Sequence, residues 1–100
     1  MNNEIGFSTN RNEGFHVTFA NGVTASVQFH EMSYCARKGK SLGEGEKSPD
    51  AEVAAWDSLG NWITGKYVSE VLNETSDDVL GYQSPEDVLK FLNWAQNYRS

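Results

Sequence analysis

The chain has 100 residues, of which 38% are hydrophobic and 22% charged, and this composition favours one folded domain over a disordered chain. Eight lysines and arginines against fourteen aspartates and glutamates leave a net charge of −6. This balance disfavours direct binding to nucleic acid or to an anionic membrane, because both need a net basic face. The single cysteine, Cys35, excludes an internal disulfide and a multi-cysteine zinc site.

Residues 1–12 are polar, whereas a signal peptide needs an apolar stretch. No apolar run approaches the roughly 18 residues that a membrane span requires. We therefore expect a cytoplasmic protein with no membrane association.

Residues 15–29 predict a β-hairpin, because apolar and polar residues alternate on both sides of an Asn-Gly pair. A two-residue loop would put the two apolar sets on opposite faces. A three-residue loop over 20–22 puts them on one face, and we favour it, with Gly22 in the left-handed conformation. The expected pairs are Phe19 with Val23, Val17 with Ala25 and Phe15 with Val27.

A second ribbon, with strands Glu52–Trp56 and Trp62–Thr64, is predicted around a turn in which Gly60 takes the left-handed position. This register places Trp56 and Trp62 side by side on one face. Such a cross-strand aromatic pair adds about 0.5–1 kcal/mol to the stability of a ribbon.

Residues 67–72 fit neither strand nor helix periodicity clearly, so an edge strand and a helical turn both remain open, and we favour the strand. The polar, acidic residues 73–78 predict a loop.

A helix is predicted over Pro85–Tyr98, where apolar residues recur at i, i+3, i+4 and i+7. Ser84 is a good N-cap, and Asp87 completes a capping box with it. Together these elements predict an α+β fold in a single domain, residues 1–100. Its antiparallel sheet has about four strands built from two hairpins, and the C-terminal helix packs on it.

The histidines and the cysteine do not form a recognisable catalytic or metal site. His16 and His30 lie about 13 Å apart along the predicted face and cannot share a metal ion unless the strand ends before His30. Cys35 has no orienting third group at a recognisable spacing, so we expect a partly buried structural cysteine. We therefore expect a protein that is not an enzyme and has no metal or cofactor.

Residues 31–50 are rich in Gly, Ser, Lys and Glu and predict a flexible surface loop. The Gly-Lys-Ser at 39–41 fails as a phosphate-binding loop, because the glycine required five positions before the lysine is Cys35. Long loops are often functional, so we interpret this one as a candidate contact segment.

Acidic residues concentrate in the second half of the chain, where residues 50–100 hold nine acids and three bases. One interpretation is that these acids are solvated residues of loops and of the helix start. The other is that they form a negative surface that docks on a basic partner, such as a protein that binds nucleic acid. Exposed tryptophans and tyrosines beside them would strengthen such an interface. The candidate partner-binding residues are Tyr34, Arg37, Lys38, Trp56, Trp62, Glu70, Glu74, Asp77, Asp78, Glu86 and Asp87.

Two stretches, EGFHVTFANGVT at 13–24 and VLGYQSPEDVL at 79–89, resemble segments of small uncharacterised accessory proteins of tailed bacteriophages. The resemblance carries no diagnostic motif, and it implies a setting and not site residues. In that setting the protein binds a host or defence macromolecule and inhibits or redirects it. The alternatives are a self-associating protein that dimerises through a sheet edge, and a small-molecule binder with a pocket near residues 30–35.

Overall fold

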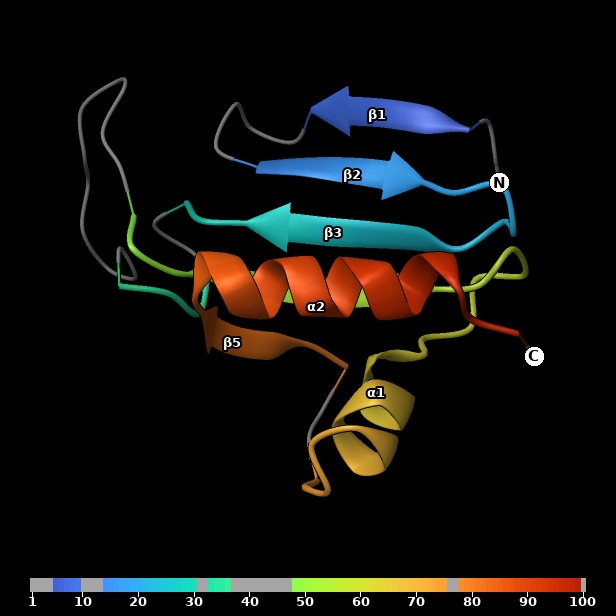
Figure 1. The fold of residues 1–100 in the computed structure, drawn as a ribbon. Coiled ribbons are helices and arrows are strands. Elements are labelled where there is room, and N and C mark those ends of the chain that lie inside the picture. Colours follow the sequence, from blue (N-terminus) through green and yellow to red (C-terminus); the bar gives the residue numbers. More distant parts are fainter. Residues whose placement is uncertain (1–4, 10–13, 31–32, 37–47, 76–77, 100) are drawn as a thin grey trace.

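The described part of the chain forms one antiparallel sheet of five strands with two helices (Figure 1). The structure, a computed structural model, describes residues 5–9, 14–30, 33–36, 48–75 and 78–99. In chain order the elements are β1 (Gly6–Thr9), β2 (Gly14–Thr18), β3 (Thr24–Gln28), β4 (Ala51–Trp56), α1 (Thr64–Glu70), β5 (Leu80–Gln83) and α2 (Pro85–Gln96). The strands lie side by side in this order, β1 to β5. The predicted α+β class is confirmed, although this part of the chain has one strand and one helix more than expected.

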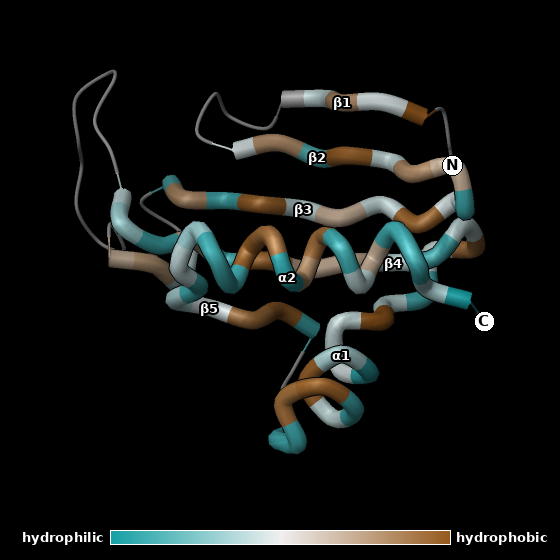
Figure 2. Tube along the Cα trace, viewed as in Figure 1, coloured by the Kyte–Doolittle hydropathy of each residue, from teal (hydrophilic) through white to brown (hydrophobic). Residues whose placement is uncertain are grey.

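The first hairpin has the predicted register. Phe15 of β2 pairs with Val27 of β3, and Val17 pairs with Ala25. Gly22 has a φ of 87°, a conformation that it adopts without steric cost because it has no Cβ. Hydrophobic and hydrophilic residues alternate along both strands (Figure 2). The apolar set therefore shares one face of the sheet.

The second predicted ribbon forms only its turn. Trp56 and Trp62 pair in an isolated antiparallel bridge, as predicted. The strand expected at Trp62–Thr64 is wrong, because the Thr64 hydroxyl accepts a hydrogen bond from the Ala55 N–H at 3.0 Å and Thr64 then begins α1. A side-chain oxygen thus replaces the backbone carbonyl that a neighbouring strand would supply. The strands beside β4 are β3 and β5, so the sheet is not built from two separate hairpins.

The strand favoured for residues 67–72 is also wrong, because α1 covers most of them. The buried side chains of Thr64, Tyr67 and Val68 follow the i, i+3, i+4 spacing of one helix face. This spacing becomes visible in the sequence once Thr64 is counted with the residues that follow it. Tyr67 then packs edge-on against Phe91 of α2, with 4.9 Å between ring centroids. The burial of Tyr67 raises the pKa of its hydroxyl.

The two edge strands were not predicted. β1 has one large apolar side chain, Phe7, which is 80% exposed, so burial imposes no alternating pattern on it. β5 contains Gly81, where a Cβ would lie only 2.7 Å from the Cβ of Tyr34. Its pairing with β4 also shifts register between Ala51 and Val53. Contact with a distant segment and an irregular ladder therefore shape β5. Residues 73–75 and 78 before it lie outside helices and strands, as predicted, and 76–77 fall outside the described residues.

α2 begins as predicted and covers the apolar face of the sheet. The Ser84 hydroxyl accepts from the Asp87 N–H, and the Asp87 carboxylate accepts from the Ser84 N–H, each at 3.1 Å. The helix contacts β3, β4 and β5. Phe91 and Ala95 on its inner face are fully buried, which places the core between α2 and these strands.

The side chain of Asn21 joins the first hairpin to the end of α2. Its amide nitrogen donates to the carbonyl oxygens of Ala95 at 3.0 Å, Gln96 at 3.2 Å and Tyr98 at 3.0 Å. Its oxygen accepts from the Val23 N–H at 3.0 Å. Because the last carbonyls of a helix have no partner within it, Asn21 acts as their cap. The helix ends at Gln96, two residues before the predicted Tyr98.

Candidate functional site

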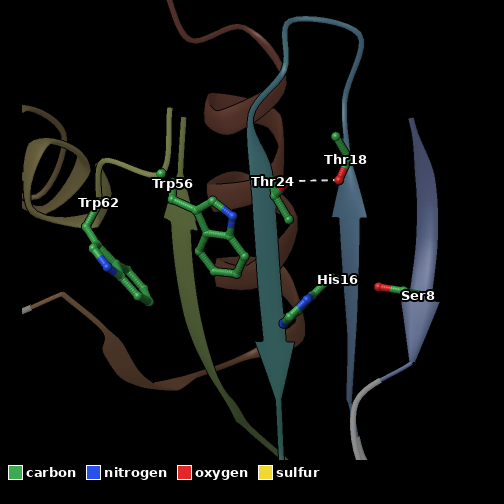
Figure 3. Close-up of a pocket in the computed structure, with 7 residues that line it drawn as sticks. Ser8, His16, Thr18, Thr24, Trp56 and Trp62 are labelled. Atoms are coloured by element: carbon green, nitrogen blue, oxygen red, sulfur yellow. Dashed lines mark hydrogen bonds between the residues drawn. The ribbon is translucent and has the colours of Figure 1, made fainter. Parts of the chain in front are cut away.

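The sheet face opposite α2 carries a pocket at the end where β4 finishes. Successive side chains of a strand point to opposite faces, so the residues that alternate with the core residues line this second face. Figure 3 shows the residues that line the pocket. Its volume is about 430 Å³. We call it the tryptophan pocket; its described lining residues are Ser8, His16, Thr18, Thr24, Trp56, Gly60 and Trp62.

Trp56 and Trp62 form one wall of the pocket. Their ring centroids lie 5.1 Å apart with 60° between the ring planes, an edge-to-face contact that favours both rings. Trp62 remains 49% exposed. The structure therefore brings together the two tryptophans that the sequence singled out and leaves one of them half in water.

The turn that presents Trp62 is held by Asp57. Its carboxylate accepts from the N–H groups of Leu59 and Asn61, both at 2.9 Å, and its own N–H donates to the Asn61 carbonyl at 2.9 Å. These bonds, the one from the Asn61 N–H above all, lower the pKa of the Asp57 carboxyl. Gly60 takes the predicted left-handed conformation, with a φ of 87°. The position of Trp62 therefore follows from a well-bonded turn.

His16 lies across the pocket from Trp56. Their ring centroids are 5.2 Å apart at 87°, and the two rings meet over β3, since β2 and β4 flank that strand. Ser26 and Thr24 beneath them are only 7% exposed. Burial lowers the pKa of His16 below its usual 6.5. The imidazole is therefore neutral at pH 7, with one nitrogen that donates and one that accepts.

Hydroxyl groups complete the pocket. The Thr18 and Thr24 hydroxyls lie 2.8 Å apart in a hydrogen bond, and Ser8 of β1 adds a third hydroxyl (Figure 3). The described lining residues include no lysine, arginine or carboxylate. Aromatic surface with neutral donors and acceptors suits an uncharged, partly apolar group of a ligand or partner.

The described candidate carboxylates are exposed but do not line the pocket. Glu70 ends α1 and Glu74 follows it, while Asp78 precedes β5. Glu86 and Asp87 begin α2, which packs on the other face of the sheet (Figure 1). The tryptophans and the acids therefore form separate surfaces. Asp77 lies outside the described residues.

Parts of the 31–50 segment pack against the sheet. Tyr34 is 48% exposed; its N–H donates to the Glu52 carboxylate at 3.1 Å, and its carbonyl accepts from the Tyr82 N–H at 2.9 Å. Cys35 is 1% exposed, so the expected structural role fits its burial. Residues 33–36 do not line the tryptophan pocket. Arg37 and Lys38, like most of the predicted loop, lie outside the described residues.

The polar part of the pocket was not predicted. His16, Thr18 and Thr24 alternate with core residues along β2 and β3, but His16 was considered only as a metal ligand and the two threonines were assigned no role. The predicted register of β2 and β3 already placed these side chains on the face opposite the core. Their position beside Trp56 follows only once β4 is known to pair with β3. Among the described residues, no group of three or more His, Cys, Asp or Glu side chains is arranged to hold a metal ion.

The chain has no significant match among family models, curated proteins or solved structures. Neither described helix combines the length and apolar character needed to cross a bilayer.

Proposed function

We propose that the protein is a non-enzymatic binding protein that holds a partner protein at the tryptophan pocket. The observation that carries this proposal is Trp62, half exposed beside a pocket on a turn that hydrogen bonds hold in place. An indole left in water forgoes hydrophobic stabilisation that a partner could provide by covering it. Tryptophan is also among the residues that contribute most at protein interfaces.

The partner we propose is a host or defence protein in the cytoplasm, which this protein inhibits or redirects, as the resemblance to phage accessory proteins implies. The exposed carboxylates on α1, α2 and the segment before β5 support a basic partner, because a field of this sign attracts positive surfaces over a distance. In this arrangement the acids speed association, and the pocket supplies the close contact.

Capture from a bacterial lysate on the immobilised full chain, followed by mass spectrometry, tests the proposal when wild type and Trp62→Ala are compared. We expect the variant to lose the captured partner, with an affinity about 30-fold weaker once that partner is purified, as for an interface hot spot. Leu59→Ala is the matched control: Leu59 lies in the same turn and is 85% exposed, but does not line the pocket.

Circular dichroism and a melting curve of each variant show whether it is folded. A folded Trp62→Ala variant that binds the partner as tightly as wild type contradicts the proposed site. Capture that is equally strong at low and high salt contradicts the part assigned to the carboxylates.

A second candidate function, self-association, is favoured by β1. It is an edge strand of the sheet without proline or charged residues, the features that usually prevent edge-to-edge pairing, and Phe7 on it is 80% exposed. Two copies paired through β1 would bury Phe7. Light scattering at two protein concentrations should then give twice the monomer mass at the higher concentration. Phe7→Ser should abolish this increase in mass. A monomer at both concentrations contradicts this candidate.

A further inference from the structure

A second cleft lies between the two helices, away from the tryptophan pocket. It has a volume of about 540 Å³ and is lined by one face of α1, one face of α2 and the residues that follow α2. From Lys90, α2 and its C-cap residue Asn97 supply lining residues at i, i+3, i+4 and i+7, the spacing of a single helix face. The size falls within the range of small-molecule sites.

Positive charge gathers at this cleft although the protein is acidic. Lys66, Lys90 and Arg99 line it, and these are all the lysines and arginines in the part of the chain that the structure describes. Glu70 is the one acidic residue among the described lining residues. Among the described lining residues, three positive charges against one negative give a formal charge of +2, in a chain whose net charge is −6. A cleft of this sign concentrates anions.

Aromatic rings stand beside these cations. Trp94 and Tyr98, both half-buried, line the cleft with 5.2 Å between their ring centroids. Tyr67 forms part of the floor and is 1% exposed. Flat rings next to cationic groups suit a ligand that combines a planar ring with phosphates, because the ring stacks while the cations meet the charge.

Lys66 is positioned across the cleft by the residues after α2. Its ammonium donates to the Tyr98 hydroxyl at 2.9 Å and lies 5.6 Å from the centre of that ring. Lys66 is charged at neutral pH, and the hydrogen bond to Tyr98 raises its pKa further. The carbonyls at the end of α2, which would repel an anion, are partly satisfied by the Asn21 amide.

We propose that this cleft binds a nucleotide, with its phosphates at Lys66, Lys90 and Arg99 and its base against Trp94 and Tyr98. This site goes beyond the proposed partner binding and does not depend on it. A mononucleotide fits the charge better than a nucleic acid strand does, because it meets the local positive charge without bringing many phosphates near the acidic remainder of the surface.

Isothermal titration calorimetry of the full chain with ATP tests this proposal through two glutamates. Glu70→Gln removes the carboxylate from the cleft, and we expect it to tighten ATP binding about threefold. Glu74→Gln changes the net charge of the protein equally but lies outside the lining residues, so we expect it to match wild type. Lys90→Gln should weaken binding about fivefold.

The alternative ligands are separate arms of the same experiment. We expect adenosine and inorganic triphosphate each to bind more weakly than ATP, because each retains only one of the two recognised parts. Triphosphate that binds as tightly as ATP, or an oligoglutamate peptide that binds more tightly, overturns the nucleotide assignment. The absence of saturable heat with millimolar ATP, or equal effects of Glu70→Gln and Glu74→Gln, overturns the site itself.

Discussion

One exposed side chain, Asn21, connects the turn between β2 and β3 to the last helix, α2. Its amide group donates to three carbonyls at the end of α2, while its oxygen accepts from the backbone of its own turn. Asparagine suits this position because it both donates and accepts. Its importance therefore comes from contacts far along the chain as well as from the preference of asparagine for turns.

We expect Asn21→Ala to lower the free energy of unfolding by about 1–2 kcal/mol, because the helix end loses its cap. Asn21→Asp should lower the free energy of unfolding further. A carboxylate cannot donate to the carbonyls, and it lies at the negative end of the helix dipole. Urea denaturation measures both. Added salt should reduce the difference in unfolding free energy between the two variants, because it screens the carboxylate. An Asn21→Asp variant as stable as wild type contradicts the capping role.

His16 makes stability depend on pH. Its pKa is lower in the folded protein than the usual 6.5, so between these two values the unfolded chain binds a proton that the folded protein does not. The contribution of His16 to the free energy of unfolding is therefore fully present above about pH 6.5. It is lost as the pH falls through the pKa of His16 in the folded protein.

We expect His16→Gln to show a smaller loss of unfolding free energy than wild type between pH 7.5 and pH 5.5, measured by urea denaturation. A His16→Gln variant with an unchanged pH dependence shows that burial of this imidazole does not cause it.

At the level of elements, local patterns predicted the β2–β3 hairpin and the start of α2, but not α1 or β5. The hairpin around Gly22 and the capping box at Ser84 are read from neighbouring residues, and both are confirmed. α1 was missed because Thr64 was assigned to a predicted strand, Trp62–Thr64. In the structure its hydroxyl accepts from the Ala55 N–H of β4, and Thr64 begins the helix. β5 depends on Gly81 packing against Tyr34, a contact 47 positions away in the chain that no local period encodes.

At the level of the whole molecule, the sequence supplies the number of charges but not their arrangement. The excess of acids in the second half was visible, yet its three bases sit in one cleft only because α1 and α2 lie beside each other. The Trp56–Trp62 pair was predictable from its turn, whereas the opposing His16 required the order of the strands. Residues brought together by one turn could be predicted, and those brought together by packing could not.

The Asn21 cap also joins two segments that are made at different times during synthesis. Its amide meets Ala95 across 74 positions of sequence, so the first hairpin leaves the ribosome long before its partner is made. Until α2 emerges, the apolar face of β2 and β3 lacks the helix that covers it, and such exposed surface is prone to aggregate. A chain whose synthesis stops before α2 is complete would therefore expose the apolar face of β2 and β3 to chaperones.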